Sequence, residues 1–120
     1  MLMIAICDDD KELCEWMKQI FIKDEEQITD EYTLDVYYSG AELCKNMEQG
    51  ISYGLILLDI ELNEPYKIDG VSVGKYIRES IRDFEVRIVY ISYKTEYAME
   101  LLQNQPFDFL VKPLEEDRLL

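Results

Sequence analysis

Acidic, hydroxyl and amino side chains follow four short apolar runs of this sequence. Asp8 and Asp9 come after the first run, Asp59 after the second, Ser92 after the third and Lys112 after the fourth. A short apolar run bounded by polar residues is typical of a strand buried on both faces of a parallel sheet. Because the carboxyl ends of parallel strands open onto one crevice, we expect these side chains to lie close together.

Three carboxylates, one hydroxyl and one ammonium group suit a divalent cation together with a phosphoryl group. Two like charges about 4 Å apart cost roughly 4 kcal/mol at an effective dielectric constant near 20, so positive charge is expected among the carboxylates. Carboxylate oxygens match Mg²⁺, and lysine and serine side chains bind phosphate oxygens. Asp59 is placed to be the nucleophile of an acyl-phosphate reaction. The chain has no histidine, and this set is a poor match to a hydrolase site.

The apolar pattern predicts one α/β domain in which strands and helices alternate. Right-handed crossovers then favour a doubly wound five-stranded parallel sheet, (βα)5, in the order 2-1-3-4-5. The expected strands cover residues 2–7, 33–38, 55–59, 86–91 and 107–111. The expected helices begin near residues 10 and 40, cover 71–81 and 94–103, and begin again at 113.

Capping and packing signals support the helices. Asp10 is the expected N-cap of the first helix, and Ser39 to Glu42 form a capping box for the second. In the third helix Val73, Tyr76 and Ile77 are expected to point inward. The final helix would have only about two turns, so we expect the natural protein to continue beyond residue 120.

Composition excludes several partners. The 120 residues include 26 acidic and 12 basic ones, for a formal net charge of −14. This balance opposes direct binding to nucleic acid or to an anionic membrane surface. No apolar run approaches the ~20 residues of a membrane span. The three cysteines lack metal-ligand spacing and are expected to be reduced core residues, which favours a cytoplasmic protein.

Over its whole length, residues 1–120, the chain resembles the receiver domain of bacterial two-component response regulators. The marks are the acidic pair, Asp59, Ser92 and the Lys112-Pro113 pair at successive strand ends, together with Asp69-Gly70 before the third helix. The resemblance implies the flavodoxin-like receiver fold. It also implies that Asp59 is the phosphoacceptor.

The resemblance also implies a role for each polar group of the site. Asp8, Asp9, Asp59 and the backbone carbonyl of Glu61 would hold Mg²⁺. Ser92 would donate a hydrogen bond to the phosphoryl group. Lys112 would pair with Asp59 or its phosphate, next to a cis peptide bond to Pro113.

The implied activity is a signalling switch and not that of a metabolic enzyme. A sensor histidine kinase would donate its phosphoryl group to Asp59. The amino-acid sequences of the first strand and of residues 88–114 are most similar to those of receivers joined to a LytTR-type DNA-binding domain. Contact with DNA and transcription regulation would then belong to a missing C-terminal part. Formation of a homodimer on phosphorylation is left open.

Two other functions remain open. A small Mg²⁺-dependent aspartyl-phosphate phosphatase would need an acid two residues after the nucleophile, and Glu61 is the candidate. A pseudo-receiver that binds partners without phosphorylation is favoured by Tyr93, where receivers usually carry a small residue, and by a loop of unusual length between Asp59 and Asp69.

Several side chains around the pocket carry predictions of their own. Tyr93 should narrow access to Asp59. Glu61 and Lys94 should form an ion pair across the mouth of the pocket and obstruct water. Phe109 is either a packing switch or a fixed core residue. The tyrosines at positions 90, 93 and 97 are expected at the surface or at an edge.

Overall fold

The computed structural model describes residues 2–23, 31–62, 69–96 and 101–114. They form a five-stranded parallel sheet in the predicted order, β2-β1-β3-β4-β5. The strands are β1 (Leu2–Cys7), β2 (Tyr32–Tyr37), β3 (Leu55–Asp59), β4 (Arg87–Ser92) and β5 (Asp108–Val111). The helical elements are α1 (Lys11–Lys23), α2 (Gly40–Glu48), α3 (Gly70–Tyr76), the π-helical turn η1 (Ile77–Ile81) and the 3-10 turn η2 (Leu102–Asn104).

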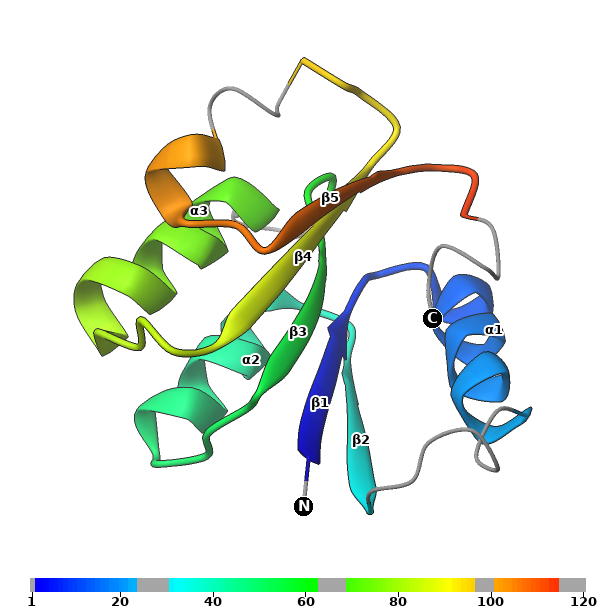
Figure 1. Ribbon diagram of the computed structural model, residues 1–120, viewed down its shortest axis with the longest axis horizontal. Helices are drawn as coiled ribbons and strands as arrows, with labels where there is room; N and C mark the ends of the chain where they lie inside the picture. The colour runs from blue at the N-terminus through cyan, green and yellow to red at the C-terminus, as the bar shows by residue number, and fades with distance from the viewer. Residues whose placement is uncertain (1, 24–30, 63–68, 97–100, 115–120) are drawn as a thin grey trace.

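Helices cover both faces of the sheet. The helix α1 lies on one face, and α2 and α3 lie on the other (Figure 1). Side chains of β3 alternate between the two cores, because Ile56 and Leu58 pack with α2 and α3 whereas Leu57 packs with α1. Burial on both faces explains why this strand reads as a continuous apolar run. No helix in the described ranges has the length and hydropathy needed to cross a bilayer.

Side-chain caps begin the helices where the sequence predicts them. Asp10 Oδ1 accepts the backbone N–H of Leu13 at 3.1 Å, and Ser39 Oγ accepts that of Glu42 at 3.2 Å. Asp69 caps α3 in the same way. These bonds satisfy backbone donors that have no partner within the first turn.

The inward face of the third helix differs from the prediction at one residue. Val73 and Ile77 are buried as expected, but Tyr76 is exposed. The inward face is completed by Gly74 and Arg78, which are four residues apart and therefore lie on one side of a helix. Tyr76 lies at the flank that faces α2.

The connection between β4 and β5 also departs from the helix predicted over residues 94–103. Residues 94–96 are not helical and residues 102–104 form the 3-10 turn η2, whereas Leu101 is helical as predicted. Ser92 Oγ accepts the backbone N–H of Lys94 at 2.9 Å, and such a bond competes with the start of a helix. Residues 97–100, with Tyr97, and the final helix expected after Pro113 lie outside the described residues.

Tyr90 is fully buried, so its predicted place at the surface is wrong. Its side chain leaves β4 toward α3, where Gly74 leaves room for the ring. A Cβ atom on Gly74 would lie 1.8 Å from the hydroxyl oxygen of Tyr90. Phe109 of β5 is half-buried against the same core, and its role in switching stays a prediction.

The close approach of Gly74 to Tyr90 yields a test. Gly74→Ala should lower the free energy of unfolding by about 1–3 kcal/mol, the usual cost of overpacking. Tyr90→Phe should recover part of this loss, because the hydroxyl oxygen is the nearest atom. Urea unfolding measures both, with Lys75→Ala on the exposed side of α3 as the control. An equal effect of Gly74→Ala in both backgrounds would contradict the packing argument.

Candidate functional site

The strand register brings the predicted site residues to one edge of the sheet. Asp59 pairs with Ile91, the residue before Ser92, and Ser92 pairs with Val111, the residue before Lys112. The strand β1, which ends just before the acidic pair, is the neighbour of β3 on its other side. The chain order of the sheet reverses at β1, and ligands of open α/β sheets bind at such a point.

The ammonium group of Lys112 lies against two buried carboxylates. Its Nζ atom is 3.1 Å from Asp59 Oδ1 and 3.4 Å from Asp8 Oδ2. Asp8 and Asp59 are each 1% exposed and Lys112 is 8% exposed. The structure therefore brings Lys112 to Asp59, as the resemblance implies. The peptide bond between Lys112 and Pro113 is cis, which was also expected.

Asp9 adds a third carboxylate to this pair. One ligand oxygen from each of Asp8, Asp9 and Asp59 lies within 4.8 Å of the other two. Asp10 is not part of the group, because its side chain caps α1 while its N–H donates to Asp8 Oδ1 at 2.9 Å. Three ionised carboxylates against one ammonium leave two negative charges. This all-oxygen set fits Mg²⁺, which would balance the charge.

Burial shifts the proton equilibria of all three central groups. It raises the pKa of Asp59 to about 7, with a further increase from the charge of Asp8 and an opposing effect of Lys112. Burial likewise raises the pKa of Asp8, against the hydrogen bond from the Asp10 backbone. Burial would lower the pKa of Lys112, but the charges of Asp59 and Asp8 outweigh it and the pKa lies above its ordinary value. Lys112 is therefore the firmly charged member of the group.

Ser92 is bound to Glu61, in place of the ion pair predicted between Glu61 and Lys94. The Ser92 hydroxyl donates to Glu61 Oε1, and the described ion pairs do not include Glu61 with Lys94, whose side chain is exposed. An exposed ion pair stabilises the folded state by only ~0–1 kcal/mol. A buried hydroxyl group without a hydrogen-bond partner destabilises it, so the bond to Ser92 is favoured. The backbone carbonyl of Glu61 remains a predicted metal ligand.

The Tyr93 ring lies beside the pocket. The Nζ atom of Lys112 is 4.9 Å from the ring centroid, which allows a cation–π interaction. Tyr93, Trp16 of α1 and Lys112 line part of a hollow of about 210 Å³. The predicted effect of Tyr93 on access to Asp59 fits this position, and its influence on rates stays a prediction.

Gly70 explains why α3 can begin beside the phosphoacceptor candidate. A Cβ atom at this position would lie 2.2 Å from the carbonyl oxygen of Asp59. The Gly70 N–H donates to the carbonyl of Ile60 at 2.9 Å. The first turn of α3 therefore packs directly on the backbone that follows β3, which only glycine allows without a shift.

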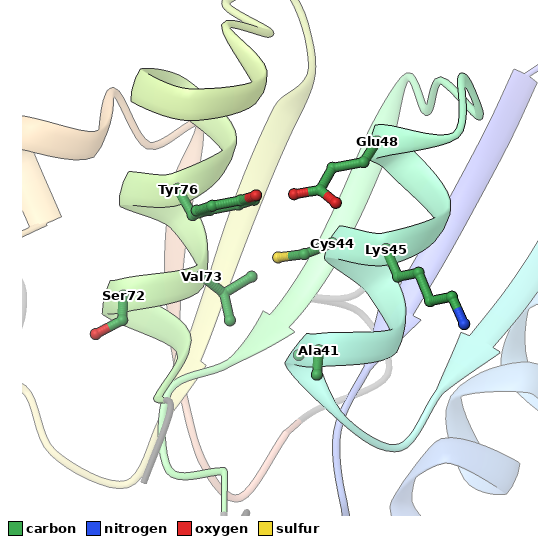
Figure 2. A pocket seen from close by; sticks show the side chains of 8 residues that line it. Ala41, Cys44, Lys45, Glu48, Ser72, Val73 and Tyr76 are labelled. Carbon is green, nitrogen blue, oxygen red and sulfur yellow. The ribbon is translucent and has the colours of Figure 1, made fainter. Parts of the chain in front are cut away.

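A separate groove of about 360 Å³ lies between α2 and α3. In Figure 2 the side chains of Cys44, Glu48, Val73 and Tyr76 come from both helices and line it. Its lining includes none of the carboxylates of the acidic group. The candidate site is therefore the charged edge of the sheet.

A comparison with known families decides the relationship. The model of the response regulator receiver domain matches residues 4–120. The chain belongs to this family. The receiver domain described here thus has its acidic group, Lys112 and Ser92 at the carboxyl edge of a sheet with the family's topology.

The curated relatives that the chain matches are longer proteins. The sensory transduction protein LytT of Oceanobacillus iheyensis is 30% identical over 73 residues, which are 61% of this chain and 28% of that protein. The transcriptional regulatory protein ZraR of Salmonella typhimurium is 28% identical over 88 residues, 73% of this chain and 19% of that protein. The chain thus spans under a third of these relatives.

Solved structures agree on the architecture. A two-component response regulator from Clostridium difficile superposes with a TM-score of 0.79 at 26% identity, covering 99% of this chain and 89% of that chain. The receiver fold predicted from the sequence is confirmed.

Two features were not predicted from the sequence, one at the site and one at the segment that precedes β5. One is the Ser92–Glu61 hydrogen bond, which no local spacing signals because the residues lie on different strand ends. The other is Arg78, which is buried and donates to the carbonyl groups of Asn104 and Gln105. Its spacing from Gly74 could have placed it inward.

The raised pKa of Asp59 yields a pH-dependent prediction in the absence of divalent cations. Its folded pKa of about 7 exceeds the ordinary 3.8 of the unfolded chain, so the folded state binds more protons between these values. The free energy of unfolding should therefore fall as the pH rises from about 4 to about 7.

Asp59→Asn should flatten this dependence, and its gain in stability over the native chain should increase with pH. Urea unfolding in EDTA at several pH values measures it. The matched control is Asp108→Asn, at an exposed position of β5, which should follow the native curve. A gain that does not vary with pH would contradict the assignment.

Proposed function

We propose that this receiver domain accepts a phosphoryl group on Asp59 from a sensor histidine kinase and acts as a phosphorylation-controlled switch. The observation that carries the proposal is the buried Asp59 carboxylate, 3.1 Å from the Lys112 ammonium and grouped with two further carboxylates. Family membership supports the same conclusion. The domain would be a signalling module and not a metabolic enzyme.

The proposed transfer uses groups that are already in place. A carboxylate oxygen of Asp59 forms a bond to phosphorus while the bond between phosphorus and the histidine nitrogen breaks, and the imidazole keeps the electron pair. The Lys112 ammonium stabilises negative charge on the transferring group. Ser92 then donates its hydroxyl proton to a phosphoryl oxygen, which would bias the face formed by β4, β5 and their connection.

The acidic group is the proposed Mg²⁺ site of the domain. Asp8, Asp9, Asp59 and the backbone carbonyl of Glu61 would hold the cation. When bound, it would supply positive charge to the phosphoryl oxygens. With all three carboxyl groups ionised, Lys112 leaves two negative charges uncompensated, and the cation would balance them.

The output is proposed from the relatives. One is named a sensory transduction protein and another a transcriptional regulatory protein. We infer that this domain is joined, in a cytoplasmic protein, to a C-terminal DNA-binding domain of the LytTR type. The acidic balance of the receiver itself, 26 acidic against 12 basic residues, fits a role without direct DNA contact.

Phosphorylation can be tested with the chain as it is. Incubation with acetyl phosphate and Mg²⁺ should add the mass of one phosphoryl group, and a histidine kinase is the second donor. Asp59→Asn should abolish the adduct, whereas Asp108→Asn should retain it. Hydrolysis of free phosphoesters would instead support a phosphatase. The absence of an adduct with both donors would support a pseudo-receiver.

The cation site has a matched pair of variants. Asp9→Asn should weaken Mg²⁺ binding by roughly tenfold or more, because a carboxylate of the group is lost. Asp10→Asn removes the same charge one residue away and still caps α1, so it should bind almost as the native chain does. Fluorescence of Trp16, the single tryptophan, reports the titration. Equal weakening by both variants would show that only overall charge matters.

A further inference from the structure

The hydroxyl group of Ser92 is engaged on two sides. It donates to Glu61 Oε1 and accepts the backbone N–H of Lys94 at 2.9 Å. Ser92 is fully buried at the end of β4, and Asp59 pairs with the residue before it on the neighbouring strand. The group proposed to bind a phosphoryl oxygen thus already has a carboxylate partner.

A serine hydroxyl carries one proton and two lone pairs. It therefore donates either to Glu61 or to a phosphoryl oxygen on Asp59, and not to both at once. The bond to a carboxylate is charge-assisted and belongs to the stronger class of hydrogen bonds. The bond from the Lys94 N–H occupies a lone pair, so it is compatible with either direction of the O–H group.

Glu61 has no competing polar contact in the part of the chain that the structure describes. Its second oxygen, Oε2, is buried and accepts no hydrogen bond there. Its charge also acts on the phosphorylation site, because it contributes to the raised pKa of Asp59. The Glu61 carboxylate is therefore close enough to raise the pKa of Asp59. Its hydrogen-bond partner is Ser92.

We propose that Glu61 is a positioning residue that latches the Ser92 hydroxyl away from the phosphoryl site while the domain is unphosphorylated. A phosphoryl group on Asp59 has to displace Glu61 in order to gain the proton of Ser92. The latch sets the balance between the resting and the switched state. This inference rests on the proposed phosphorylation of Asp59 and adds the competitor that opposes it.

Binding of beryllofluoride, a phosphoryl mimic, tests the latch in the full chain with Mg²⁺. Fluorine NMR measures the affinity. Glu61→Ala should bind roughly tenfold more tightly than the native chain, the scale of one charge-assisted hydrogen bond. Glu61→Gln keeps an acceptor without the charge and should be intermediate. Glu85→Gln, which removes an exposed carboxylate, should be unchanged, and thermal unfolding verifies that each variant is folded.

A second background separates the latch from simple charge repulsion, because loss of any nearby carboxylate favours an anionic ligand. In Ser92→Ala, which has no hydroxyl proton to release, Glu61→Ala should give a smaller gain, limited to the loss of its charge. An equal gain in both backgrounds would assign the whole effect to charge and overturn the latch. So would the absence of a gain in the native background.

Failure of the proposed function would be recognisable by itself. If neither the native chain nor any variant binds beryllofluoride, phosphorylation of Asp59 is contradicted. The hydrogen bond between Glu61 and Ser92 is then tested by NMR of the unphosphorylated protein. There, Glu61→Gln should shift the Cβ resonance of Ser92, while the amide of Lys94 should change little because its bond to Ser92 remains. An unchanged Ser92 resonance would overturn the latch.

Discussion

The buried ammonium group of Lys112, paired with Asp8 and Asp59, is the interaction on which the pocket depends. An uncompensated buried charge costs several kcal/mol, so each carboxylate needs this partner or a proton. The pKa values of all three groups are raised for this reason. Burial raises the pKa of both carboxyl groups, while their combined charge keeps Lys112 protonated.

The position of Lys112 depends in turn on contacts far from the pocket. Lys112 follows β5, which is an edge strand with one neighbour, β4. The buried guanidinium of Arg78 donates to the carbonyl groups of Asn104 and Gln105, just before β5. At the other end, the N–H of Lys112 donates to the carbonyl of Ser92 at 2.8 Å. The π-helical turn η1 and β4 therefore position β5, the strand that precedes Lys112.

Predictions from the sequence succeeded where one local rule decided the outcome. The strand that ends at Asp59 is buried on both faces, so its apolar run identifies it without tertiary information. The N-cap of α1 is also a local feature, because the Asp10 side chain accepts the backbone N–H of Leu13 in the same helical turn. Tyr90 and Tyr76 were misplaced because both are large amphipathic side chains. The burial of Tyr90 depends on Gly74 of α3, because the absence of a side chain there leaves space for the Tyr90 ring, whereas Tyr76 lies exposed.

The sequence by itself determined the strand order and the meeting of Asp8, Asp59, Ser92 and Lys112 at one edge, because apolar periodicity and right-handed crossovers leave few alternatives. The family followed from the resemblance of the motifs at those strand ends. Tertiary structure decided which polar groups pair within that edge. Glu61 binds Ser92 and not Lys94, since the choice depends on burial and on distances across strands. Such choices are made by desolvation energies that no spacing along the chain records.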